Sequence, residues 1–150
     1  MNCVDSTSRP RRSGRYVFRT ENCRRYAFPT HVNELVIDRS QAAASEVFLV
    51  EIEDGHALPL HRHDDMEQVY YVVEGRGTLT VNGEQHPIQP GDAVLIPASA
   101  PHTVTAEGGR VRYLAVDSFL NADAKNEPTW DEHVRVVCEE LGWDYDEVVK

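Results

Sequence analysis

Short segments separated by turn residues constrain the fold of this sequence most. From residue 16 to residue 117, runs rich in β-branched and aromatic side chains are broken by glycine, proline and asparagine. Asn82-Gly83 is the strongest turn signal, because this dipeptide favours two-residue β-hairpin turns. Such short strands at nearly even spacing predict an antiparallel sandwich or barrel. The expected strands are residues 16–20, 34–38, 46–53, 58–63, 68–74, 78–81, 84–89, 93–96, 102–106 and 110–117.

The sequence changes character after residue 117 and predicts one amphipathic helix over residues 130–141. Pro128 suits the start of a helix, and Gly142 suits its end. We expect this helix to pack on the outside of the β body. Apolar residues recur at helical spacing at Val134, Val137, Cys138 and Leu141. The predicted organisation is a flexible basic tail (residues 1–15), a β-barrel (16–120, with its motif core at 46–117) and a C-terminal helical extension (121–150).

The charge of the chain excludes several kinds of partner. The formal net charge is −10, although residues 1–25 hold seven arginines against Asp5 and Glu21. Because so acidic a body repels phosphate, we expect no nucleic-acid partner. The apolar runs are too short to cross a membrane, and no apolar leader precedes the barrel. The expected location is therefore cytoplasmic, which fits three cysteines without a paired motif.

Two histidines, His61 and His63, form the clearest candidate site. If they lie on a strand, their side chains share one face, with Cα atoms roughly 6–7 Å apart. Two imidazoles at this spacing can converge on one metal ion. Glu67 and Gln68 follow closely, but adjacent strand residues face opposite ways, so only one of them can point inward. His102, at the start of a later expected strand, is a candidate for a further ligand.

Together these residues resemble the two motifs of the cupin superfamily. The first motif is filled by Gly55, His61, His63 and Gly75, and the second by Gly91, Pro97, Ser99, His102 and Ala106. The resemblance covers residues 46–117. It implies an all-β, six-stranded antiparallel jelly-roll barrel that holds one divalent transition metal inside. Ligand type does not choose among Fe, Mn, Ni, Co, Cu and Zn. The resemblance also implies a homodimer formed through residues 16–50.

The sequence departs from this family most clearly at the usual glutamate ligand. Four residues separate His63 from Gln68 and six separate Gln68 from Gly75, which is the family spacing. Gln68 is therefore the expected fourth ligand, with Glu67 as the alternative and a three-histidine site as a third possibility. Some cupins that act on unsaturated sugar acids carry glutamine at this position. Ser99 and Ala106 replace the usual glycine and asparagine of the second motif.

Several further residues are candidates for lining the site or for acting there as a general acid or base. Tyr70 shares the face of Gln68, so it is either a pocket wall that orients substrate or a plain core residue. Glu51 and Glu53 are candidates for a general acid or base, although strand residues of this kind are more often solvated. We expect the remaining polar candidates to lie on the surface: Arg62, His56, His86 and His133.

The resemblance leads to a functional hypothesis of a metal-dependent small-molecule enzyme. The metal on His61, His63, Gln68 and His102 would act as a Lewis acid on an oxygenated substrate. Four neutral ligands leave the charge of the ion uncompensated, which favours an anionic substrate. Isomerase, cyclase or lyase chemistry is preferred. The alternatives are an Fe(II)-dependent dioxygenase and, in another class, a non-catalytic small-molecule-binding cupin.

Overall fold

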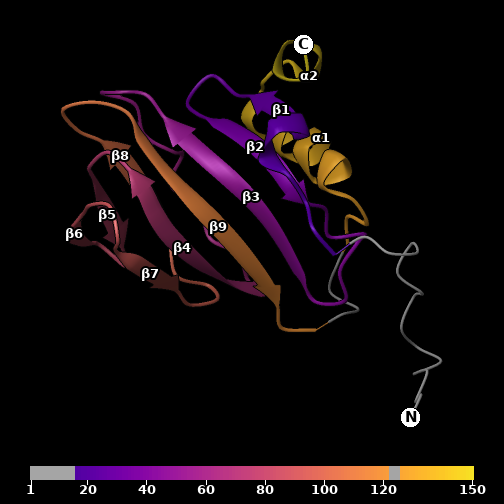
Figure 1. Ribbon diagram of the computed structural model, residues 1–150, viewed down its shortest axis with the longest axis horizontal. Helices are drawn as coiled ribbons and strands as arrows, with labels where there is room; N and C mark the ends of the chain where they lie inside the picture. The colour runs from indigo at the N-terminus through magenta and orange to yellow at the C-terminus, as the bar shows by residue number, and fades with distance from the viewer. Residues whose placement is uncertain (1–15, 122–125) are drawn as a thin grey trace.

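A computed structural model describes residues 16–121 and 126–150 of the chain. The predicted basic tail of residues 1–15 lies outside the described residues, as does part of the predicted helical extension. Figure 1 shows two β-sheets facing each other, with the C-terminal helices beside one end of the larger sheet. None of the helices in the described part of the chain is long and apolar enough to span a membrane.

The larger sheet has six strands in the order β1-β2-β3-β9-β4-β7, and the smaller has the order β6-β5-β8. All neighbouring strands pair antiparallel. The expected all-β, antiparallel jelly-roll fold with a C-terminal α-helix is thereby confirmed. The strands of the larger sheet are β1 (Arg24–Ala27), β2 (Val32–Ile37), β3 (Ser45–Ile52), β4 (Met66–Glu74), β7 (Ala93–Ile96) and β9 (Val111–Phe119). Those of the smaller sheet are β5 (Gly77–Val81), β6 (Glu84–Ile88) and β8 (His102–Ala106).

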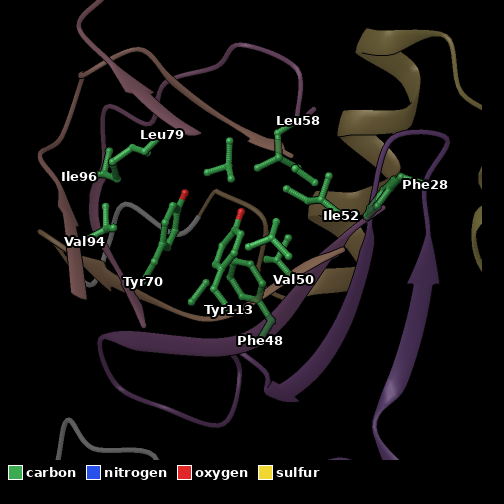
Figure 2. Packing of buried hydrophobic residues seen from close by; sticks show 14 of the residues in the cluster. Phe28, Phe48, Val50, Ile52, Leu58, Tyr70, Leu79, Val94, Ile96 and Tyr113 are labelled. Atoms are coloured by element: carbon green, nitrogen blue, oxygen red, sulfur yellow. The ribbon is translucent and has the colours of Figure 1, made fainter. Parts of the chain in front are cut away.

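Alternating side chains explain how the strands enclose a core. Every second residue of β9 is buried, from Val111 to Phe119, and β8 alternates in the same way. Because strand side chains alternate between faces, each inner face contributes one row of apolar groups to the space between the sheets. Figure 2 shows this packing, with Tyr70 of β4 and Tyr113 of β9 side by side.

The backbone conformation and surroundings of Gly75 explain why the first motif ends in glycine. Its φ is +76°, in the left-handed region that favours glycine. A Cβ at this position would also lie 1.8 Å from the backbone oxygen of Arg110. The turn that leads from β4 to β5 therefore depends on the absence of a side chain.

Helix α1 (Trp130–Leu141) confirms the predicted helix boundaries. Its first turn is capped by the Thr129 side chain, which accepts a hydrogen bond from the backbone N–H of Glu132 at 3.2 Å. At its end, Gly142 adopts φ 70°, and the Trp143 N–H donates to the carbonyl of Cys138. A short helix, α2 (Tyr145–Val148), follows.

Three local expectations differ from the structure. Residues 16–20 form no strand; a 3₁₀ turn (Thr20–Asn22) leads instead into β1. Residues 58–63 form only an isolated bridge at His61, since Pro59 lacks the N–H that a continuous ladder needs. Finally, α1 does not pack simply on the outside of the β body, because Trp130 and Val134 line a cavity together with strand residues. The spacing of apolar residues predicts which face of α1 is apolar, but it does not predict which surface of the β-sheets this face packs against.

Candidate metal centre

Three histidines come together at one end of the space between the sheets. His61 pairs with His102 in an isolated antiparallel bridge, which brings the first and second motifs into contact. The ring centroid of His61 lies 4.9 Å from that of His63 and 4.2 Å from that of His102. One ligand atom from each of the three residues lies within 4.8 Å of the others. Imidazole nitrogens this close together can share one metal ion.

Backbone carbonyls fix which ring nitrogen faces the cluster. The Nδ1 atom of His61 lies 2.6 Å from the carbonyl oxygen of Pro59, and that of His102 lies 2.9 Å from the carbonyl oxygen of Ala100. Because a carbonyl oxygen only accepts, each Nδ1 carries the proton and donates it. Each Nε2 then keeps its lone pair, as a metal ligand requires.

The Nε2 atom of His102 fits a bound cation. His102 is 1% exposed, and its Nε2 is buried without a hydrogen-bond partner among the described residues. A buried nitrogen lone pair without a partner is unfavourable unless a donor or a cation faces it. Since His61 and His63 offer their own nitrogens beside it, the cluster is chemically suited to a divalent transition metal.

Burial keeps these imidazoles neutral. Desolvation, with a smaller contribution from neighbouring histidines, lowers the pKa of His63 to about 3 and that of His102 to about 4. Desolvation also lowers the pKa of His61. The neutral form is the one that binds a metal. The fold therefore favours the ligand state of all three residues at neutral pH.

These shifts predict that the metal-free protein loses stability as the pH falls from 7 to 5.5. The unfolded histidines, with a pKa of about 6.5, take up protons in this range, whereas the folded ones do not. Each such histidine lowers the free energy of unfolding by up to about 1.4 kcal/mol per pH unit below 6.5. Urea unfolding at several pH values measures the slope. His63→Leu should reduce it and the exposed-site variant His86→Ala should not; a flat profile in the native protein would contradict the prediction.

Gln68 lies on the inner face of β4 and Glu67 on the other. Gln68 is 4% exposed and lines the cavity beside the histidines, whereas Glu67 is half-buried on the opposite face of the strand. The Gln68 Nε2 donates to Asp117 Oδ1 at 2.7 Å, and the Tyr70 hydroxyl donates to Gln68 Oε1 at 2.9 Å. These two bonds fix the amide so that its oxygen faces Tyr70. A carbonyl oxygen has two lone pairs, so Oε1 keeps one for a further partner.

Three buried ionisable residues, Asp117, Glu46 and Arg39, support the position of Gln68. Asp117 contacts Glu46, and burial followed by this second carboxyl raises the pKa of Asp117 well above its usual range. This raised pKa favours the protonated form of Asp117. Glu46 in turn accepts hydrogen bonds from Arg39 at 2.7 and 3.0 Å. The three residues are each no more than 2% exposed.

A cavity of about 350 Å³ extends from the histidines to helix α1. Tyr70, for which the sequence left a pocket wall and a core residue open, lines the cavity and is also part of the hydrophobic core, and its hydroxyl donates to Gln68. His133 of α1 also lines the cavity, with its side chain only 22% exposed, so the expectation that it lies on the surface is wrong. The position of α1 explains this difference, because α1 forms one wall of the cavity.

The other candidates lie away from the histidines, except Arg62, which follows His61 in the chain and lines the same cavity. His56 and His86 are exposed, as expected. Arg62 is largely exposed at the cavity rim and pairs with Asp64. Glu51 bonds Arg110 at 2.9 Å and Glu53 is exposed; neither is among the residues that line the cavity in the described chain.

Sequence reasoning missed the polar residues that the strands bury. Asp117 occupies the same alternating row of β9 as Tyr113, and Glu46 occupies the inner row of β3. In both strands a charged residue stands where the two-residue alternation predicts an inward-facing apolar one. This departure from the pattern could have identified Asp117 and Glu46 as buried polar residues. Asn33 of β2 and Trp130 of α1, which also line the cavity, gave no comparable signal.

Comparison with known proteins supports the assignment of this fold. Residues 48–117 match the family model of the cupin domain. A quercetin 2,3-dioxygenase from Bacillus subtilis is 30% identical over 116 residues, which are 77% of this chain and 34% of that relative. The dimethylsulfoniopropionate lyase DddW from Ruegeria pomeroyi is 38% identical over 82 residues, which are 52% of this chain and 53% of that relative. The chain thus spans about one third to one half of the length of these curated relatives.

A solved structure shows the same architecture. The crystal structure of a predicted oxalate decarboxylase from Thermotoga maritima superposes with a TM-score of 0.64 at 20% identity. The superposition covers 69% of this chain and 99% of that one. Paired motifs, facing antiparallel sheets and an inward histidine cluster agree with the family match, and residues 48–117 of this chain are therefore a cupin domain.

Proposed function

We propose that this protein is a metal-dependent enzyme that acts on an anionic, oxygenated small molecule. One divalent transition metal would be held by His61, His63 and His102, with the Gln68 oxygen as fourth ligand. The observation that carries the proposal is the buried Nε2 of His102, which lacks a partner among the described residues and lies beside the two other histidines. A histidine packed only for structure would pair this nitrogen.

The residues around the metal position would set the charge of the site. When bound, the metal supplies Lewis-acid polarisation of a substrate oxygen. The three imidazoles are neutral and Gln68 adds no charge, so the ligands leave the charge of the cation uncompensated. Tyr70 holds the Gln68 oxygen from one side, and Asp117 holds the amide nitrogen from the other. Both contacts keep the oxygen, and not the nitrogen, available as a ligand.

An Fe(II)-dependent dioxygenase is the second candidate. It is favoured by the similarity to quercetin 2,3-dioxygenase, which extends over 77% of this chain. A site that binds metal through neutral imidazoles suits iron as well as zinc. The two candidates differ in whether molecular oxygen is consumed.

Metal loading with and without oxygen tests the proposal. The metal-free protein, the zinc protein and the anaerobically prepared Fe(II) protein are each incubated with sugar acids, enolisable carboxylates and hydroxyaromatic acids. Products are followed by NMR and oxygen with an electrode. We expect conversion by the zinc protein without oxygen uptake, and none by the metal-free protein. Turnover restricted to Fe(II) with stoichiometric oxygen uptake would support the second candidate, whereas metal binding without any turnover would support a non-catalytic binding protein.

A further inference from the structure

The wall of the cavity is unusually aromatic. Phe48 contacts Trp130 of α1 with ring centroids 4.5 Å apart, and Phe28 contacts Trp143 at 5.6 Å. Tyr113 packs against Tyr70 with ring centroids 4.6 Å apart, and the ring of Tyr70 lies 6.4 Å from that of His102. All six aromatic side chains line the same cavity. Aromatic surface therefore extends from the histidine cluster to α1.

Three polar atoms in this wall have no hydrogen-bond partner among the residues that the structure describes. They are Asn33 Oδ1, the Tyr113 hydroxyl and Trp130 Nε1, on side chains that are between 1% and 5% exposed. With His102 Nε2 they are the buried side-chain polar atoms without a partner in the described part of the chain. Buried polar groups in folded proteins are nearly always paired, so groups of this kind around one cavity indicate a ligand.

Strand register places these groups in one part of the site. Tyr113 of β9 is opposite Val50 of β3, which is opposite Asn33 of β2. Asn33 and Tyr113 are thus two strands apart in one row, about 10 Å between Cα atoms. Trp130 stacks on Phe48, which lies two residues before Val50 on the same face of β3. Figure 2 shows the Tyr113 and Tyr70 hydroxyls directed into the interior between the sheets.

The chemistry of the three atoms limits what can fill the cavity. Trp130 Nε1 only donates, Asn33 Oδ1 only accepts, and the Tyr113 hydroxyl can do either. A complementary ligand must carry an acceptor oxygen, a hydroxyl donor and flat apolar surface between them. We infer that the cavity is a binding site for a planar hydroxyaromatic acid, recognised by Asn33, Tyr113 and Trp130, with its acidic oxygen directed to the histidine cluster. This inference rests on the proposed function, since it concerns the substrate of the same site.

A polyhydroxylated aliphatic acid fits this wall poorly. Such a ligand needs a hydrogen bond for most of its hydroxyl groups, because burying them unpaired is unfavourable. Beyond Asn33, Tyr113 and Trp130, the aromatic part of the wall offers these hydroxyls no partner, so hydroxyls that face the rings would be buried unpaired. The wall therefore favours hydroxyaromatic acids over sugar acids, the substrate class of some cupins that carry glutamine at the position of Gln68.

Calorimetric titration of the zinc-loaded protein, with NMR to check that each probe is recovered unchanged, tests the inference. The probes are 2-hydroxy-1-naphthoate and D-galacturonate. We expect 2-hydroxy-1-naphthoate to bind at least tenfold more tightly than D-galacturonate. Equal binding, or tighter binding of the sugar acid, would overturn the inference.

Tyr113→Phe and Asn33→Leu test the named residues. Each should weaken 2-hydroxy-1-naphthoate binding about five- to tenfold, the loss expected for one hydrogen bond. Tyr113→Phe keeps the ring and removes only an unpaired hydroxyl, so the melting temperature of the unliganded protein should stay equal or rise; a purely structural hydroxyl would lower it. Tyr71→Phe is the matched control, because Tyr71 is 49% exposed on the outer face of β4.

The outcomes separate this inference from the proposed function. If zinc binds and neither Tyr113→Phe nor Asn33→Leu changes affinity for the naphthoate, the inference is wrong and the metal site stands. If zinc does not bind, the proposed function fails. The same naphthoate titration of the metal-free protein, with its dependence on Tyr113 retained or lost, then decides the inference by itself.

Discussion

His102→Ala should reduce the metal content of the protein from about one ion per chain to less than one tenth of that. His102 is the most buried of the three histidines, and its Nε2 has no partner among the described residues. Removing it leaves two imidazoles and an amide, which hold a divalent ion far more weakly than three imidazoles and an amide. Elemental analysis after purification and dialysis against a fixed zinc concentration measures the effect.

His86→Ala is the matched control for this variant. The His86 side chain is 51% exposed on β6 and pairs only loosely with Glu84, at 3.5 Å. This variant should keep the full metal content. Circular dichroism of both metal-free variants checks that they remain folded. A His102→Ala protein that is folded and retains one ion per chain would show that the histidine cluster is not the metal site.

Arg39→Met should lower the free energy of unfolding by about 3–5 kcal/mol. Arg39 is 2% exposed and forms two hydrogen bonds to Glu46, which is fully buried. Removing one partner of a buried pair leaves the other charge uncompensated. The loss is compounded because Arg39 also donates to the carbonyl of Glu127 at 3.1 Å, which ties the segment before α1 to the sheet. Chemical denaturation of the metal-free protein measures the change.

Two further variants test whether the buried Arg39–Glu46 pair contributes more to the free energy of unfolding than surface ion pairs do. Arg39→Met combined with Glu46→Leu removes both charges and should recover much of the lost stability, since a buried ion pair replaced by apolar residues is often neutral. Arg110→Met, which breaks exposed contacts to Glu51 and Glu74, should leave the free energy of unfolding nearly unchanged, because exposed ion pairs contribute little stability. An Arg39→Met protein as stable as Arg110→Met would contradict the role given to the buried pair.

The strand pattern and the two motifs predicted much of this molecule. Alternation and turn residues identified β3 to β9, apart from small shifts at their ends, and helical spacing identified α1. Counting residues between His63 and Gly75 placed Gln68 inward, which its burial agrees with. These features depend on local geometry, namely the two-residue period of strands and the fixed length of turns, which short stretches of sequence encode.

The parts that the sequence did not predict depend on contacts between distant segments. Trp130 and His133 line the cavity only because α1 packs over the inner face of the larger sheet. Asn33 belongs to the cavity because β2 pairs with β3 in one particular register. Asp117 lies opposite Gln68 through the pairing of β4 with β9, 49 residues apart in the chain. No local pattern encodes these partners, so the sequence alone could predict neither the aromatic cavity wall nor the contacts that support Gln68.

The proposed function requires one metal ion bound by His61, His63, His102 and Gln68. Anomalous diffraction from crystals of the zinc-loaded protein, collected on both sides of the zinc absorption edge, tests it most directly. We expect one anomalous peak per chain, about 2.0–2.2 Å from the three Nε2 atoms and from Gln68 Oε1. A peak on Glu67, or a peak away from the three histidines, would contradict the account.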